Sequence, residues 1–106
     1  MFRNDGLVAR YIIEGKRQLV KEEGMETRIA LIGIIVENTD SVERLNHLLH
    51  EYGEYIIGRM GIPHRERHMN IISIVMDAPQ EIISALSGKV GMLPGINSKV
   101  IYGKKQ

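Results

Sequence analysis

The amino-acid sequence predicts a single α+β domain, and three observations support this class. The chain has 106 residues, about the length of one domain with one modest core. Isoleucine-rich runs are interspersed with segments whose apolar residues recur at helical spacing. Two of the isoleucine-rich runs are apolar on both sides. We therefore expect a sheet combined with helices in one unit.

The clearest strand is predicted at residues 27–37, which are rich in isoleucine. The run is β-branched and too short to favour a helix. Side chains of a strand alternate between two faces, so Ile29 and Ile35 fall on one face. Ile32 and Ile34 fall on the other. Because neither face is polar, we expect both to be buried.

A helix is predicted to follow this strand. Asp40, with Glu43 three residues later, has the form of a capping box that opens a helix. Gly53 is a suitable end, because glycine adopts positive φ without a Cβ penalty. The apolar positions expected to pack on the sheet are Val42, Leu45, Leu48, Leu49 and Tyr52.

A second strand is predicted to begin at residues 55–57. Gly58 and Gly61 loosen it, and Pro63 removes a donor from its hydrogen-bonded ladder. We therefore expect an edge strand, or a strand that is bent or bulged between Gly61 and Pro63.

The remaining elements are predicted to be a strand, a helix and a strand. A turn at residues 68–70 leads into a strand at residues 71–76, and Pro79 suits the first turn of the next helix. The Pro-Gly pair at residues 94–95 ends that helix, and residues 96–102 alternate as a last strand. The apolar stripe of the helix consists of Ile82, Ile83, Leu86, Val90 and Leu93.

The order strand, helix, strand, strand, helix, strand fits a ferredoxin-like fold, in which two helices cover one face of a four-stranded antiparallel sheet. The other face has no helical cover. Because residues 27–36 and 71–76 are apolar on both sides, we expect another copy of the chain to cover the open face. The sequence thus predicts a homo-oligomer, either a dimer or a tetramer.

The domain is predicted over residues 25–106, preceded by an N-terminal extension at residues 1–24. The extension has an incomplete apolar stripe and is expected to dock loosely or to reach a partner subunit. A further interpretation is that it is a translated leader and that Met25 is the native start. Residues 21–24 support this, because they can be encoded by a purine-rich run that resembles a bacterial ribosome-binding site.

Composition excludes several classes of function. The chain has no cysteine, which excludes disulfides, thiolate metal sites and cysteine nucleophiles. Its formal net charge of +1 gives no electrostatic reason to expect nucleic acid or a membrane as a partner. No run approaches the roughly 20 apolar residues of a membrane span. A cytoplasmic protein is expected.

Three motifs carry a resemblance to a known family. RIALIGIIVEN begins at Arg28, GRMGIP occupies residues 58–63, and GMLPG occupies residues 91–95. From Arg28 to Lys104 the chain resembles the iron-only hydrogenase system regulators. The resemblance implies a ferredoxin-like, ACT-like fold, similar also to the regulatory domain of nickel-responsive repressors, and a regulatory role. Those repressors carry a separate DNA-binding domain, for which residues 1–24 are too short, so no direct binding of nucleic acid is expected.

A metal site is one candidate. If the second strand continued to residue 68, its period of two would place His64, Glu66 and His68 on one side. Residues i and i+4 lie about 13 Å apart along a strand, so another strand or subunit would have to help hold one ion. A site between subunits, like that of a nickel repressor, would supply that help. The alternative is a pair of solvated surface histidines.

An anion site is a second candidate, offered by three arginines: Arg59, Arg65 and Arg67. A guanidinium beside the exposed backbone of Gly58 and Gly61 could hold a carboxylate or phosphate through two hydrogen bonds. The likeness to ACT domains implies a small ligand near the first strand-helix turn, which contains Asn38 and Thr39. The alternative is that these residues only build turns and cap a helix.

No pattern typical of catalysis was found. The serines have no spacing to histidine and carboxylate that indicates a nucleophile, and there is no glycine-rich phosphate loop. We therefore predict no catalytic residues and no enzyme activity, and the sequence does not indicate whether a cofactor is bound. The predicted function is a ligand-sensing or interaction domain related to the iron-only hydrogenase system. The alternatives are a metal-binding regulatory domain that uses His64 and His68 at a subunit interface, and a structural partner subunit.

Overall fold

The computed structural model describes residues 26–104. The predicted N-terminal extension and the start at Met25 lie outside the described residues. The main elements are β1 (Arg28–Val36), α1 (Val42–Glu51), β2 (Ile56–His64), β3 (Met69–Ala78), α2 (Gln80–Gly91) and β4 (Ile96–Tyr102). Three short 3-10 turns connect them: η1 (Thr39–Ser41), η2 (Gly53–Tyr55) and η3 (Arg65–Arg67). The predicted order of strands and helices is confirmed.

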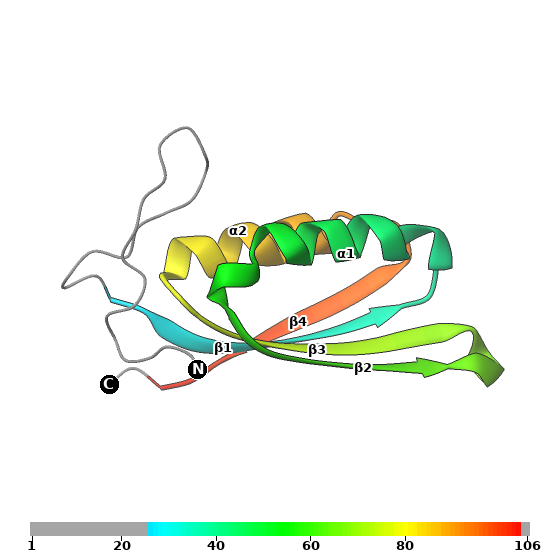
Figure 1. Cartoon of the computed structure of the whole chain (residues 1–106), viewed down its shortest axis with the longest axis horizontal. Coiled ribbons are helices and arrows are strands. Elements are labelled where there is room, and N and C mark those ends of the chain that lie inside the picture. Colours follow the sequence, from blue (N-terminus) through cyan, green and yellow to red (C-terminus); the bar gives the residue numbers. More distant parts are fainter. Residues whose placement is uncertain (1–25, 105–106) are drawn as a thin grey trace.

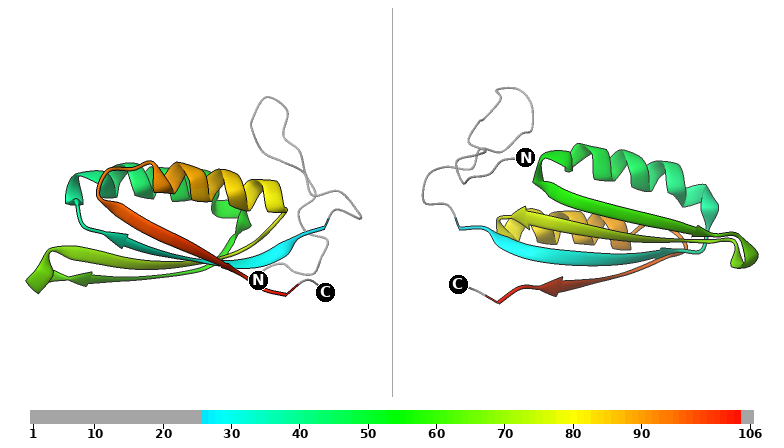
Figure 2. Two further views of the ribbon diagram at one scale, coloured as in Figure 1. Left: turned by 180° about the vertical axis from the view of Figure 1, so that it is seen from behind. Right: turned by 60° about the horizontal axis from the view of Figure 1, so that its bottom comes forward.

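The strands form one antiparallel sheet in the order β2-β3-β1-β4. Both helices lie on the same side of this sheet (Figures 1 and 2). This arrangement confirms the ferredoxin-like fold. It also confirms that β2 is an edge strand, since β2 pairs with β3 alone. Neither helix in residues 26–104 has the length and hydrophobicity that a bilayer crossing requires.

The core lies between the helices and the covered face of the sheet. Along β1 the side chains alternate, so that Ile34 is 1% exposed and Ile35 is 39% exposed. The prediction that both faces are apolar holds, but a single chain buries only the face under the helices. The buried hydrophobic residues are Ala30, Ile32, Ile34, Val36, Leu45, Leu49, Ile72, Ile74, Met76, Ala78, Ile83, Leu86, Val90 and Leu93.

The entry into α1 differs from the prediction. Asn38 is the capping residue, because its Oδ1 accepts a hydrogen bond of 2.9 Å from the backbone N–H of Asp40. Ser41 precedes α1 and makes no capping hydrogen bond with its side chain. The predicted capping box of Asp40 and Glu43 is therefore wrong. The physical reason is that the 3-10 turn η1 separates the capping residue from the α-helix.

Two backbone details of the glycine-containing turns also differ. Gly53 opens η2 without positive φ, and within residues 26–104 only Gly95 among the glycines has positive φ, at 70°. The irregularity in β2 lies between Ile56 and Gly58, upstream of the stretch ending at Pro63 where it was predicted. Pro63 fits the edge strand without a bulge, because its missing N–H interrupts pairing on one side only.

Candidate functional site

A hollow with a volume of about 340 Å³ lies at the end of the sheet where β2 and β3 are joined. We call it the hairpin-end hollow. It brings together the turn after β1, the end of β2, the connection η3 and the start of β3. Its lining residues are Thr39, Pro63, His64, Arg65, His68, Met69 and Asn70.

The connection between β2 and β3 is built by a compact turn. The backbone N–H of His68 donates to the carbonyl oxygen of Arg65 at 3.2 Å. His68 itself has φ 56° and ψ 42°, a left-handed conformation that is uncommon for residues other than glycine. Met69 then begins β3 opposite His64. The turn thus reverses the chain and places His68 on the hollow.

The strand predicted to continue through residue 68 is wrong. β2 ends at His64, and Glu66 lies in η3 and does not line the hollow. His64 and His68 are brought together by the turn and not by strand alternation. Within residues 26–104 there is no group of three or more histidine, aspartate or glutamate side chains that could hold a metal ion. Further ligands for an ion at His64 and His68 would have to come from another subunit.

Arg59 lies outside the hairpin-end hollow. It pairs with Ile74, so its side chain belongs to the helix-covered face of β2. Its Nη2 donates to Oδ1 of Asn46 on α1 at 2.7 Å and joins the edge strand to the helix. Gly61 lies on the same face as Arg59, whereas Gly58 lies on the opposite face. These three residues therefore do not surround one point.

Asn38 and Thr39 have different surroundings. Asn38 uses its Oδ1 to cap η1, whereas Thr39 lines the hairpin-end hollow. The turn that contains them is fastened to the turn before β4. The hydroxyl of Ser41, which is buried, donates to the carbonyl oxygen of Pro94 at 2.7 Å. The loop that carries Thr39 is therefore fixed from two sides.

The hollow offers several donors to a ligand. The lining residues carry a guanidinium (Arg65), imidazoles (His64 and His68), a hydroxyl (Thr39) and an amide (Asn70). His64 pairs with Met69 and Asn70 pairs with Pro63, so the side chains of His64 and Asn70 leave opposite faces of the sheet. This set suits an oxyanion or another small polar ligand, and the imidazole pair could contribute two ligands to a metal ion.

Asn70 was not singled out from the sequence. Asn70 lies opposite Pro63 in the pairing of β2 with β3. This position can be inferred from the sequence only when the position of the turn between the two strands is known.

Comparison with known proteins identifies the family. Residues 28–100 match the TM1266-like family, described as "Iron-only hydrogenase system regulator, putative". The solved structure of the uncharacterized protein TM1266 from Thermotoga maritima is 36% identical and superposes with a TM-score of 0.72. That match covers 74% of this chain and 100% of the other. No curated protein matches this chain. The chain therefore belongs to the TM1266-like family of iron-only hydrogenase system regulators.

Proposed function

We propose that this protein is a ligand-sensing regulatory domain of an iron-only hydrogenase system and that the hairpin-end hollow binds a small anion. The family assignment supports the regulatory role. The observation that carries the ligand proposal is that Thr39, Arg65 and Asn70 line one hollow. The absence of cysteine in the chain supports a reducing compartment, and we place the protein in the cytoplasm.

An anion is the ligand that these groups favour. A guanidinium holds a carboxylate or phosphate through two parallel hydrogen bonds, and hydroxyl and amide donors add direction to the contact. The volume of about 340 Å³ lies near the lower end of the range for small-ligand pockets, which suits a ligand of amino-acid size. In this proposal Arg65 takes the role expected for Arg59, because Arg59 already donates to Asn46.

Titration with inorganic phosphate and with glutamate tests this site. We expect either anion to raise the melting temperature of the full chain, because it binds the folded state alone. Arg65→Ala should weaken the affinity by about tenfold to a hundredfold, since a hydrogen bond to a charged group contributes about 1.5–3 kcal/mol. Arg67→Ala is the matched control, because Arg67 lies in the same turn but does not line the hollow. Equal losses in the two variants would contradict the proposal.

A metal ion is the second candidate, because His64 and His68 line the same hollow. Glu66 would join them only after a rearrangement of η3 or from another copy of the chain. Calorimetric titration with nickel or zinc separates the two candidates. Heat that disappears in the double variant His64→Ala, His68→Ala, with no stabilisation by anions, would favour the metal. If neither ligand binds, the remaining alternative is a structural partner subunit.

We also propose that a second copy of the chain covers the open face of the sheet. All four strands contribute large apolar side chains to this face. The exposed side chains therefore form one contiguous patch and are not isolated on the surface. The same patch on both copies would form a symmetric interface. Its exposed members are Ile29, Leu31, Ile35, Met60, Ile62, Ile71 and Ile101.

Substitution at the centre of this face tests the assembly. Leu31 lies on the central strand β1 and is 37% exposed in the single chain. We expect Leu31→Lys to convert the oligomer to monomer in sedimentation velocity, because a charge would be buried without a partner. Ala85→Lys introduces the same charge on the exposed surface of α2 and should leave the sedimentation coefficient unchanged. A wild-type protein that is monomeric at all concentrations would disprove the interface.

A further inference from the structure

The strand β4 forms the second edge of the sheet. The strand order β2-β3-β1-β4 leaves it paired with β1 alone, and Figure 2 shows it as the outermost strand on its side. Among residues 26–104 no other strand lies along its outer side. An edge strand presents a row of unpaired N–H and C=O groups to which a further strand can bond. We call this row the β4 edge.

Two backbone hydrogen bonds show which groups of β4 are unpaired. The N–H of Gly103 donates to the carbonyl oxygen of Ile29 at 2.8 Å, and the N–H of Glu37 donates to the carbonyl oxygen of Gly95 at 2.7 Å. In an antiparallel pair, residues that bond to the partner strand alternate with residues whose backbone groups point away from it. The residues that point their N–H and C=O groups outward from β4 are Ile96, Ser98, Val100 and Tyr102.

The two edges of the sheet differ in how well they suit a further strand. β2 has an irregular register between Ile56 and Gly58 and contains Pro63, which has no N–H. Irregularities and prolines of this kind protect an edge from pairing. β4 contains neither proline nor glycine and keeps an unbroken register with β1 from Ile96 to Tyr102. The β4 edge is therefore the one that can accept a strand along its whole length.

The helix packed on β4 leaves room beside this edge. Nε2 of Gln80, the first residue of α2, donates to the hydroxyl of Tyr102 at 2.8 Å, so this side of α2 is turned toward β4. Residues at helical spacing from Gln80 lie on the same side, and they are Ser84, Ser87 and Gly91. Their side chains are short, so they leave space for α2 of a second copy to lie alongside when the strands pair.

We propose that β4 pairs antiparallel with β4 of a second copy of the chain, so that the two sheets become one. A register centred on Ser98 makes the strand complementary to itself. In this register Asn97 lies opposite Lys99, so an amide meets an ammonium group, and the apolar Ile96 lies opposite Val100. A register centred on Lys99 would place two like charges opposite each other, which destabilises a strand pair. This self-complementarity favours a second copy over an unrelated strand.

The β4 edge and the open face are different surfaces, so the two contacts can form or fail separately. A single strand pair buries less than the roughly 1,200–2,000 Å² of a stable interface. Chains joined only at β4 should therefore separate at micromolar concentration, and Leu31→Lys is still expected to be monomeric in sedimentation velocity. Chains that use both surfaces form an assembly of more than two copies.

Amide hydrogen exchange, measured residue by residue by NMR on the full chain, tests the pairing. The sample is Leu31→Lys, which lacks the open-face contact, at about 1 mM and after about twentyfold dilution. We expect the amides of Ser98 and Val100 to exchange about threefold or more slowly in the concentrated sample, because they are hydrogen-bonded only in the pair. The amides of Asn97 and Lys99 are bonded to β1 and should show no such dependence.

A proline at the centre of the edge should abolish this effect. Ser98→Pro removes an outward N–H and leaves the hydrogen bonds to β1 in place, as prolines in edge strands do. The concentration dependence at Val100 should therefore disappear. Ser98→Ala keeps the N–H and is the matched control, in which the dependence should persist. Circular dichroism verifies that both variants are folded.

A cross-link provides a second test that needs no proline. The chain has no cysteine, so Ser98→Cys carries a single thiol. Hydrogen-bonded residues opposite each other have Cα atoms about 5.5 Å apart, which lies within the range of a disulfide. With oxidised glutathione, two copies of Ser98→Cys should become linked about tenfold faster than two copies of Ala85→Cys, whose thiol lies on the exposed surface of α2.

Three results would each overturn the proposal. The first is exchange at Ser98 and Val100 that is fast at both concentrations, and the second is equal cross-linking of Ser98→Cys and Ala85→Cys. The third is slow exchange of both amides at every dilution, which would show that another segment of the same chain pairs with the β4 edge. Because these experiments do not need the open-face contact, a wild type that is monomeric at micromolar concentration would count against that contact alone.

Discussion

Replacement of Ile34 by alanine is expected to lower the free energy of unfolding by about 4 kcal/mol. Ile34 is 1% exposed and lies on β1, between β3 and β4, under the helices. Removal of its branched side chain loses apolar burial and leaves a cavity that the surrounding residues refill only partly. The free energy of unfolding of a domain is typically about 5–15 kcal/mol, so this one substitution removes a large part of the stability. Urea unfolding measured by circular dichroism gives the loss.

Ile35 provides the matched control, because it is the next residue of the same strand and has the same chemistry. It is 39% exposed and faces the open side of the sheet. We expect Ile35→Ala to cost about 1 kcal/mol in the single chain. If a second copy covers the open face, the cost should rise with protein concentration, since assembly stabilises the folded state by mass action. Equal, concentration-independent losses at Ile34 and Ile35 would contradict the assignment of the two faces.

Gly95→Ala is expected to cost about 3 kcal/mol. The φ of 70° at Gly95 is a left-handed conformation, which costs an alanine about 1–2 kcal/mol. An added Cβ would also clash with Cβ of Asn38 and lie 3.0 Å from its backbone nitrogen. To relieve this clash the two turns must separate, which weakens the 2.7 Å hydrogen bond from the N–H of Glu37 to the carbonyl oxygen of Gly95. The measurement is again equilibrium unfolding.

Gly88→Ala is the control for that variant. Gly88 lies inside α2, without positive φ, and an added Cβ would meet nothing within 4 Å. Alanine is favoured over glycine in a helix by about 1 kcal/mol, so this variant should be more stable than the wild type. Destabilisation of similar size in both variants would show that the conformation of Gly95 is not the cause.

Most of the fold was predictable from the sequence because packing against the core requires apolar residues at regular spacing, every second residue in a strand and every third or fourth in a helix. The alternation along β1 and the helical spacing of Ile83, Leu86 and Val90 are consequences of packing against the same core. The capping residue was not predictable in this way. Asn38 and Asp40 are both good caps by chemistry, and the choice depends on the turn that contains Gly95, which is distant in sequence and packs against Asn38.

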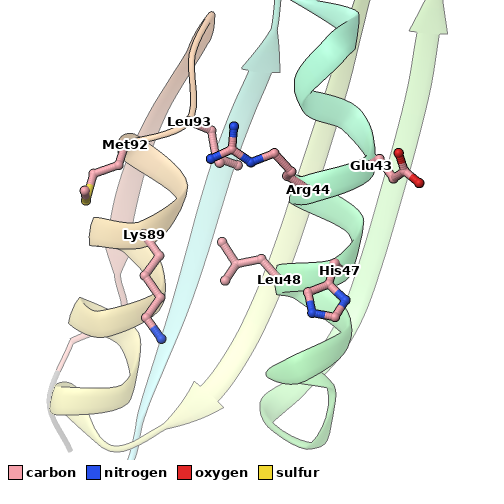
Figure 3. A pocket seen from close by; sticks show the side chains of 7 residues that line it. All are labelled: Glu43, Arg44, His47, Leu48, Lys89, Met92 and Leu93. Atoms are coloured by element: carbon pink, nitrogen blue, oxygen red, sulfur yellow. The ribbon is translucent and has the colours of Figure 1, made fainter.

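The candidate sites were predictable only in part. His64, His68 and Thr39 were identified from the sequence. That they line one hollow depends on the left-handed conformation of His68, which the sequence does not indicate because the residue is not a glycine. A hollow of about 590 Å³ between α1 and the end of α2 was missed altogether (Figure 3). Arg44 and Met92 are separated by 48 positions, and only the packing of the two helices brings them to one surface.

The hydrogen bond from the hydroxyl of Ser41 to the carbonyl oxygen of Pro94 joins two turns, and each turn is next to a residue that lines a different hollow. Thr39 lines the hairpin-end hollow and lies two residues before Ser41, while Leu93 lines the hollow between α1 and α2 and directly precedes Pro94. A ligand that displaces Thr39 would therefore move the border of the hollow between α1 and α2 through one hydrogen bond and a few peptide units. Any such influence acts in both directions, because the coupling of two binding equilibria is reciprocal. The link is measured by the change in the amide chemical shifts of Met92 and Leu93 when phosphate binds, and this change should disappear in Ser41→Ala.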